Sequence, residues 1–399
     1  MEHNSLDIKW VRQQFPALKN TMAFMDNAGG SQTLKPVIDR ITEYLTDYDV
    51  QLGASYLTSQ LASEKLDSAK VTIQSWINAK NSEEVMIGSS TTMLLRILSL
   101  CISQNWKKND EVIITNCDHE ANMAPWRDLQ KIGIKVKTWK LNQDSYRLEP
   151  DDLKNLMTEN TKLVAVTHTS NILGTINPIK DIAKLVHSHK ALICVDGVAF
   201  APHRLVDVQD LDVDFYVFST YKTFGPHQAI MYGKLALLTQ MNGINHPFID
   251  SIPYKFQPGN LNYELSYSLT AIPDYIKKIG GNNLAIGYEK IADYEEKLAY
   301  QLIESLNSNP KIKIIGETSA DKKIRVSTIS FVHEEILSDQ IVEQVDAYSM
   351  GIRFGDFYAV ELIDDLDLRQ NNGVVRVSLV HYNSYDEVDK LIRIFKEIL

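Results

Sequence analysis

One lysine, Lys222, stands where the chain could present an amine for covalent chemistry. It follows the apolar run 215–218 and a hydroxyl-rich turn, and Gly225 and Pro226 close the segment. A lysine at the end of a buried strand can be desolvated, which lowers its pKa and makes its amine a nucleophile toward a carbonyl group. The alternative is an ordinary surface lysine in a loop, and the segment taken alone favours that alternative.

Three more polar residues each come shortly after a predicted strand: His119, Asn171 and Asp196. Short apolar runs bounded by turn residues predict the strands, which lie at 85–87, 111–115, 134–139, 162–167, 191–195 and 215–218. Helical patterns separate these strands, as at 60–79 and after Pro178, so the sequence predicts an α/β fold with a parallel sheet covered on both faces. Ligands of such sheets bind at the carboxyl ends of the strands. We therefore expect the three residues and Lys222 to converge on one site.

A small polar turn from Gly88 to Thr92 precedes a nearly all-apolar helix that begins near Met93. Free N–H groups and the positive end of the helix dipole make such a turn a suitable site for a phosphate group. A helix cap formed by the threonines is an equally good explanation at this point. The turn is neither a Walker A loop nor a GxGxxG fingerprint, which disfavours a nicotinamide oxidoreductase.

The pattern changes after about Ile244. A long helix is predicted at 283–306, a strand at 325–332, a helix at 338–348 and a last helix that begins with a capping box, Ser384 and Glu387. The segment 374–379 alternates like a half-buried strand, with Arg376 on its polar side. These elements predict a second, smaller α+β unit.

The composition is that of an ordinary globular protein. Of 399 residues, 44% are hydrophobic and 23% charged, and the formal net charge of −10 disfavours nucleic acid and anionic membranes as partners. The three cysteines, Cys101, Cys117 and Cys194, have no metal-ligand or disulfide spacing, so we expect no metal site. No leader-like stretch follows Met1 and no apolar run could span a bilayer. We expect a cytoplasmic protein.

Several motifs together resemble the fold-type I pyridoxal-phosphate enzymes of the class V aminotransferase and cysteine desulfurase group. The motifs occur in family order over essentially the whole chain: 26–29 (DNAG), 118–122 (DHEAN) with 125–126 (PW), 168–175 (HTSNILGT), 195–197 (VDG), 219–222 (STYK) and 376–378 (RVS). The segments 353–359 and 380–383 are most similar to a cysteine desulfurase-like branch. The resemblance implies a large domain at 19–258 with a mainly parallel seven-stranded sheet, a small α+β domain at 259–399, and an N-terminal arm at 1–18 that packs with the small domain.

The resemblance also implies a role for each matching residue. Lys222 would bind pyridoxal 5′-phosphate covalently and then move the proton at the substrate Cα, while Asp196 would pair with the pyridinium nitrogen. His119 would stack on the cofactor ring and Asn171 would contact its phenolic oxygen. The phosphate would be held by Thr91, Thr92, Ser219 and Tyr221, with Asn260 reaching the phosphate of the other subunit in a homodimer. Arg376 would bind the substrate carboxylate; the other substrate-binding residues would be Arg353, Tyr358, Ala28 and Gly29.

This sequence also departs from the desulfurase pattern. Ala199 replaces a glutamine and Tyr221 replaces a histidine before the lysine, while Asn260 stands where the desulfurases commonly have a threonine. The loop expected to carry the sulfur-accepting cysteine holds Asp356, Phe357 and Tyr358, and no cysteine follows Cys194. Cys117, beside the 118–122 motif, is a weak alternative acceptor.

The sequence therefore predicts a pyridoxal-phosphate enzyme acting at Cα and Cβ of a small amino acid. The leading reaction is β-elimination or C–S lysis without an enzyme persulfide. A class V aminotransferase, or an epimerase, would use the same lysine, aspartate and arginine, so these alternatives stay open. A catalytically idle cofactor-binding interaction protein is disfavoured, because Lys222, Asp196 and Arg376 are all present.

Overall fold

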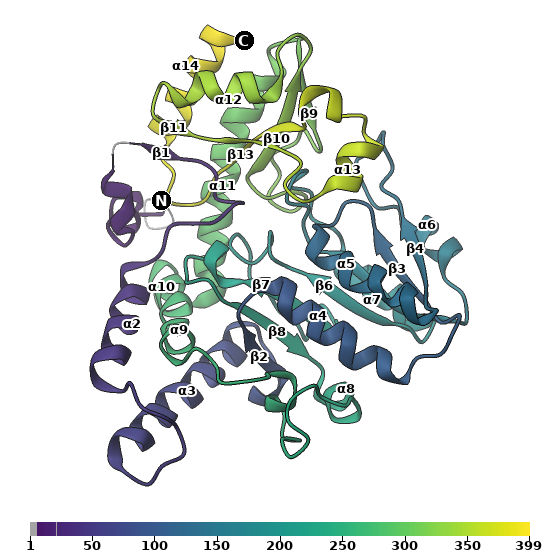
Figure 1. Ribbon diagram of the computed structural model, residues 1–399. Helices are drawn as coiled ribbons and strands as arrows, with labels where there is room; N and C mark the ends of the chain where they lie inside the picture. The colour runs from purple at the N-terminus through teal and green to yellow at the C-terminus, as the bar shows by residue number, and fades with distance from the viewer. Residues whose placement is uncertain (1–5, 21) are drawn as a thin grey trace.

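The computed structural model describes residues 6–20 and 22–399. Its larger sheet has seven strands in the order β2-β8-β7-β6-β5-β3-β4, as the family resemblance implied (Figure 1). The strands are β2 (Val85–Gly88), β3 (Glu111–Thr115), β4 (Lys135–Trp139), β5 (Thr161–Thr167), β6 (Leu192–Asp196), β7 (Phe215–Ser219) and β8 (Ala229–Gly233). Only β8 among them runs against its neighbours, so the sheet is mainly parallel. The six strands predicted for this sheet agree with the structure to within one residue at each end.

Helices cover both faces of the large sheet, as expected. Side chains of α4 (Thr91–Ile102) and α5 (Ala124–Arg127) pack on one face, together with β-strand residues such as Val112 and Val217. On the other face α3 (Leu57–Trp76) and α7 (Ile179–Ser188) join the core. Since both faces are covered, the strands are buried, and this explains why their sequences are nearly continuous apolar runs.

The smaller sheet is antiparallel, in the order β12-β13-β10-β9. Its strands are β9 (Ile312–Ile315), β10 (Thr328–His333), β12 (Arg353–Gly355) and β13 (Val374–Ser378), and its helices are α11 (Leu284–Asn307), α12 (Ser338–Asp346), α13 (Val360–Asp365) and α14 (Tyr385–Ile398). The capping box of Ser384 and Glu387 begins α14, as predicted. In Figure 1 this unit lies above the large sheet, beside the chain's carboxyl end.

The prediction that Arg376 lies on the polar side of a half-buried strand is wrong about its exposure. All five residues of β13 are buried and Arg376 is only 1% exposed. The alternation itself is present, since Val375 and Val377 face the core of the smaller unit. The other side of the strand faces the large sheet rather than solvent, and Arg376 lies there.

The start of the chain contacts both units. In the predicted N-terminal arm, residues 1–5 lie outside the described residues. Leu6, which precedes α1 (Ile8–Gln13), and Ile8, its first residue, pack against the cores of both units. Strand β1 (Ala23–Phe24) then pairs with β11 (Met350–Gly351) of the smaller unit.

The helices after residue 258 contact both units. Helix α9 (Tyr263–Ser268) lies against α2 (Lys35–Asp47) and α3, and α10 (Ala271–Ile279) lies against α11. The domain boundary at residue 258 stays a prediction.

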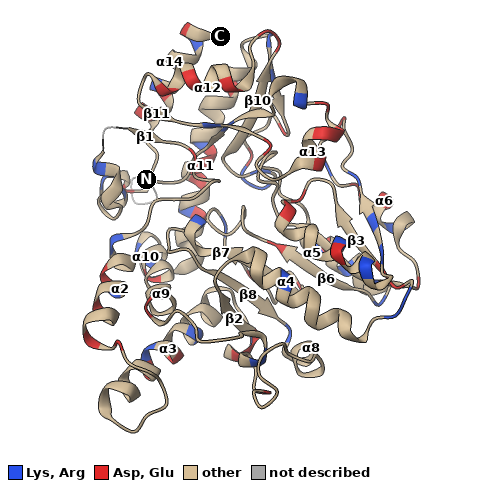
Figure 2. Ribbon diagram, in the orientation of Figure 1, with Lys and Arg blue, Asp and Glu red and all other residues tan. Residues whose placement is uncertain are grey.

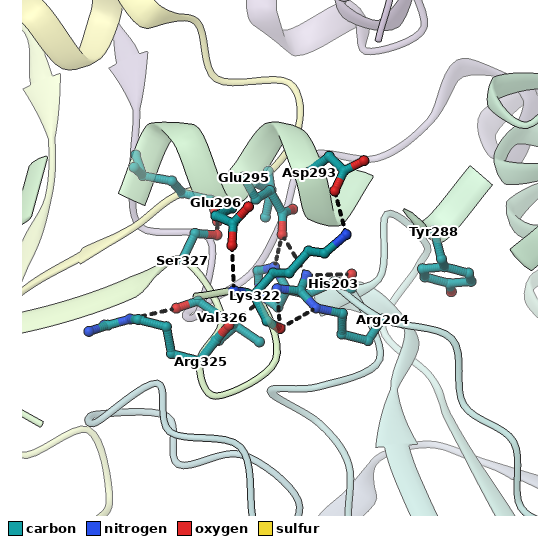
Figure 3. Close-up of polar contacts among 12 residues, drawn as sticks. His203, Arg204, Tyr288, Asp293, Glu295, Glu296, Lys322, Arg325, Val326 and Ser327 are labelled. Carbon is teal, nitrogen blue, oxygen red and sulfur yellow. Dashed lines mark hydrogen bonds and ion pairs between the residues drawn. The ribbon is translucent and has the colours of Figure 1, made fainter. Parts of the chain in front are cut away.

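A buried polar cluster joins α11 to the segment that follows β6 (Figure 3). The carboxylate of Glu295 is fully buried and lies 2.9 Å from His203 Nδ1 and 3.4 Å from Arg204 Nη1. Arg204 also donates hydrogen bonds to the backbone carbonyls of Lys322 and Arg325. These contacts fix the turn after Asp196 against the smaller unit.

Across residues 6–20 and 22–399, no helix combines the length and the apolar character that crossing a bilayer needs.

Candidate active site

Two adjoining cavities lie where the large sheet meets the smaller unit. The inner cavity, of about 500 Å³, is bounded by the carboxyl ends of β5, β6 and β7 and by the N-terminus of α4. It is lined by Ser90, Thr91, Thr92, His119, Ala121, Thr167, Thr169, Asn171, Asp196, Val198, Ala199, Ser219, Tyr221 and Lys222. Every residue predicted to bind the cofactor is therefore at this cavity, except Asn260.

The N-terminus of α4 forms a hydroxyl-lined end of the inner cavity. Ser90 caps the helix by accepting the N–H of Met93 at 3.2 Å, and Thr91 Oγ1 lies 2.7 Å from Ser219 Oγ. Arg96 is the only charged residue in α4, which is almost entirely tan in Figure 2. The free N–H groups and positive dipole of the first turn thus meet no fixed anion of the helix itself, which suits a phosphate group.

Asp196 ends β6 as a buried carboxylate. Its Oδ1 accepts one hydrogen bond, from the Val198 N–H at 2.9 Å, and its backbone carbonyl accepts the His168 N–H at 2.8 Å. Burial raises the pKa of Asp196 to about 6, against the lowering effects of the Val198 N–H and the Lys222 charge. A cationic N–H donor inside the cavity would favour its ionised form.

Lys222 lies in the short turn after β7. Burial and, to a lesser degree, the nearby Arg376 charge lower the pKa of Lys222 to about 8, with Asp196 and Asp26 opposing the shift. A larger fraction of this amine is therefore neutral near pH 7 than for a solvated lysine. The preceding residue, Tyr221, places its ring 5.7 Å from Lys222 Nζ and stacks on His227 at 4.8 Å.

His119 follows β3 and presents a neutral ring. Its Nδ1 accepts the Ala121 N–H at 3.0 Å, and burial, with the Lys222 and Arg376 charges, lowers its pKa to about 4. Because Nδ1 is the acceptor, the ring proton is assigned to Nε2. The adjacent Asp118 is a buried carboxylate whose pKa burial raises to about 7; it accepts the Thr167 N–H at 2.9 Å and so ties this loop to β5.

The outer cavity, of about 800 Å³, contains all the residues predicted to bind substrate: Arg376, Arg353, Tyr358, Ala28 and Gly29. It shares His119, Asn171, Tyr221 and Lys222 with the inner one, so the two are continuous. Burial lowers the pKa of Arg376 to about 10, which leaves its guanidinium charged at neutral pH. Asp26 accepts from Arg376 Nη2 at 2.9 Å, and its other oxygen lies 3.5 Å from Arg353 Nη1.

Several buried polar atoms around these cavities have no protein partner among the described residues. They are Thr169 Oγ1, Asn171 Oδ1 and Arg376 Nε. Buried groups are normally hydrogen-bonded, so these atoms point to a polar ligand. Together with the hydroxyl-lined helix end, Asp196 and the desolvated Lys222, they fit a phosphorylated pyridine aldehyde. Asn171 Nδ2 donates a hydrogen bond to the Phe357 carbonyl at 2.9 Å, and the contact of Asn171 with the phenolic oxygen stays a prediction.

The structure does not bring Asn260 to the site within one chain. Asn260 is exposed, and its Nδ2 lies 3.4 Å from Gln51 Oε1. Conversely, sequence reasoning did not assign site roles to Asp26, Phe357 or Thr169. Asp26 opens the 26–29 motif, Thr169 follows β5 and Phe357 lies in the segment 353–359, so position alone could have indicated all three.

All three cysteines are free and buried. Burial raises the pKa of Cys117 to about 12 and that of Cys101 to about 11, and it raises the pKa of Cys194 well above its usual value. None of them lines either cavity. Within residues 6–20 and 22–399, no group of three or more His, Cys, Asp or Glu side chains could hold a metal ion.

A desolvated lysine after one strand, a buried carboxylate at the end of the neighbouring strand and a hydroxyl-lined helix N-terminus are the groups that would hold pyridoxal phosphate. The chain belongs to the class V aminotransferase family, whose profile matches residues 23–391. Its cofactor is pyridoxal phosphate.

Known proteins of this family are similar over the whole chain. Aminotransferase-like protein FGM3 of Gibberella zeae is 43% identical over 409 residues, with 100% of each chain covered. Cysteine desulfurase-like protein ustD of Aspergillus flavus is 33% identical over 398 residues, covering 96% of this chain and 89% of its own. A solved structure of apo cysteine desulfurase from Thermococcus onnurineus NA1 has a TM-score of 0.89 at 26% identity, with 100% of this chain and 99% of that one covered.

Proposed function

We propose that this enzyme removes a β-substituent from a small amino acid without forming a persulfide on the protein. The observation that carries the proposal is the composition of the outer cavity. This cavity is lined by both the charged Arg376 and Lys222. The loop at its border carries Asp356, Phe357 and Tyr358 but no thiol. The raised thiol pKa values of the buried cysteines also oppose a thiolate acceptor, because the thiolate is the reactive form.

Each residue has a defined task in this proposal. Arg376 binds the α-carboxylate of the substrate through charge-assisted hydrogen bonds. Lys222 removes the proton from Cα, and the β-substituent leaves Cβ with the electron pair of its bond. Asp196 would keep the ring nitrogen protonated, His119 would contact the ring, and Thr91, Thr92, Ser219 and Tyr221 would hold the phosphate. Pyridoxal phosphate supplies the electron sink for the Cα carbanion. After hydrolysis the products are a keto acid and ammonia.

A second candidate is transamination. The similarity to FGM3, which is named an aminotransferase-like protein and is 43% identical to this chain, favours it. In this reaction Lys222 would deliver the proton taken from Cα to the cofactor, and the β-substituent would stay on the keto-acid product. The same carboxylate, lysine and arginine serve both reactions, so the products decide between them.

The test is product analysis with defined amino acids. The purified enzyme is incubated with L-cysteine, β-chloro-L-alanine and L-alanine, and pyruvate, ammonia and pyridoxamine phosphate are measured. We expect pyruvate and ammonia in equal amounts from the first two, and no accumulation of pyridoxamine phosphate. Stoichiometric pyridoxamine phosphate and keto acid, without free ammonia, would overturn the proposal in favour of transamination. The Lys222→Ala variant is the control for non-enzymatic elimination.

We further propose a homodimer and a cytoplasmic location. The three free thiols support a reducing compartment. A groove of about 1280 Å³ supports the dimer; it is bordered by Met93 and Leu100 of α4, which are 50% and 56% exposed, and by Asn260. A second copy seated in the groove would bring its own Asn260 toward the N-terminus of this α4.

A further inference from the structure

Phe357 and Arg376 form a close pair in the outer cavity. The Arg376 Cζ lies 3.6 Å from the centroid of the Phe357 ring, which is cation–π contact. The edges of the guanidinium are also held: Nη2 donates to Asp26 at 2.9 Å and Nη1 to the Asn171 carbonyl at 3.3 Å. The buried Nε has no partner among the described residues. The ring thus fixes the plane of a guanidinium that still has a donor to offer.

The backbone that presents this ring is strained. Phe357 and Tyr358 have φ values of 51° and 60°, a region that bulky residues rarely adopt. Residues in such conformations persist only where their surroundings hold them, and they concentrate at functional sites. Here the Phe357 carbonyl accepts from Asn171 Nδ2 at 2.9 Å, and the Tyr358 carbonyl accepts the Glu120 N–H at 2.8 Å. Both donors belong to loops at the carboxyl end of the large sheet.

We propose that Phe357 is a positioning residue for the substrate carboxylate. Its ring holds the Arg376 guanidinium in the plane in which the remaining N–H donors, that of Nε among them, meet the carboxylate, and its carbonyl ties the same loop to Asn171 of the cofactor cavity. The inference rests on the proposed function of Arg376 as the carboxylate-binding residue. It predicts that the ring acts on substrate binding and on carboxylate recognition rather than on the proton transfer at Lys222.

Three substitutions at this position separate the ring from its bulk. Phe357→Ala removes the ring, Phe357→Leu keeps apolar volume without an aromatic face, and Phe357→Tyr keeps the ring. With β-chloro-L-alanine we expect Ala and Leu to raise KM on the order of tenfold, which is the size of a desolvated cation–π contact, while kcat changes by less than about twofold. Phe357→Tyr should restore KM.

A second measurement reports on carboxylate recognition directly. L-alanine and L-alaninamide are titrated into the holoenzyme, and binding is followed by the change in cofactor absorbance. The wild type should prefer the acid, and both Phe357→Ala and Phe357→Leu should lose most of that preference. If Phe357→Ala does not fold, the comparison of Leu with Tyr decides.

The outcomes separate this inference from the proposed function. Suppose that Phe357→Leu keeps the wild-type KM and acid preference, while Arg376→Lys raises KM and loses the acid preference. This result would overturn the role of Phe357 and leave that of Arg376 intact. An unchanged acid preference in Arg376→Lys would instead overturn the proposed role of Arg376, because lysine cannot reproduce a two-pronged pair with a carboxylate.

Discussion

Burial sets the acid–base behaviour of Lys222. Since its pKa is lowered to about 8, the neutral fraction of the amine rises as the pH increases through 8. We predict that protein stripped of pyridoxal phosphate captures added cofactor faster with increasing pH, with a midpoint near pH 8, as followed by cofactor absorbance. A midpoint at ~10.4, the pKa of a solvated lysine, would contradict the effect of burial.

Borohydride reduction of the loaded enzyme and peptide mapping should label Lys222, and label on another lysine would refute the assignment.

Asp196 is predicted to matter for turnover more than for cofactor retention. In the Asp196→Asn variant a neutral amide cannot hold a proton on the ring nitrogen, so the Cα carbanion loses its electron sink. We expect the variant to retain cofactor, since the phosphate and lysine contacts remain, but to lose activity by at least about 100-fold. The measurements are cofactor absorbance after dialysis and initial rate. Turnover within a few-fold of wild type would exclude this role.

At the scale of the elements, Gly197 makes the turn after β6 possible. A Cβ at Gly197 would lie 2.1 Å from the Tyr216 hydroxyl oxygen and 2.2 Å from its ring. We predict that Gly197→Ala lowers the free energy of unfolding by about 1–3 kcal/mol and weakens cofactor retention, because Asp196 and Val198 flank this residue. Thermal unfolding and dialysis measure the two effects. The matched control is Gly351→Ala, whose Cβ would have its nearest neighbour at 3.5 Å. Equal behaviour of both variants would count against the steric cause.

The sequence identified the elements well because the local signals agree. β3 begins and ends where the apolar run predicts, and α14 begins where the Ser384–Glu387 box predicts. The burial of Arg376 could not be predicted in this way. Its neighbours Asp26 and Asn171 lie 350 and 205 positions away in the chain, and no local pattern encodes such contacts. The strained backbone of Phe357 is likewise set by distant hydrogen bonds rather than by residue type.

At the scale of the whole molecule, the exposed groove beside α4 suggests that one chain does not complete the site. We predict a two-fold homodimer in which Asn260 of each subunit acts at the other's phosphate site. Sedimentation should give a dimer at assay concentration, and Asn260→Ala should weaken cofactor retention without unfolding the chain. An active monomer would disprove this arrangement. Phe248→Ala is a matched surface control, because Phe248 is 83% exposed and lines neither the groove nor either cavity.

The most direct measurement of the proposed chemistry follows the fate of sulfur. The holoenzyme is incubated with L-cysteine, thiols are trapped by alkylation during turnover, and each of Cys101, Cys117 and Cys194 is examined by mass spectrometry for persulfide. With all three thiols buried and their pKa values raised, we expect sulfide in solution in amounts equal to pyruvate and no persulfide on any cysteine. A stoichiometric persulfide on Cys117 that forms at the rate of turnover would contradict the proposal and make Cys117 the sulfur acceptor.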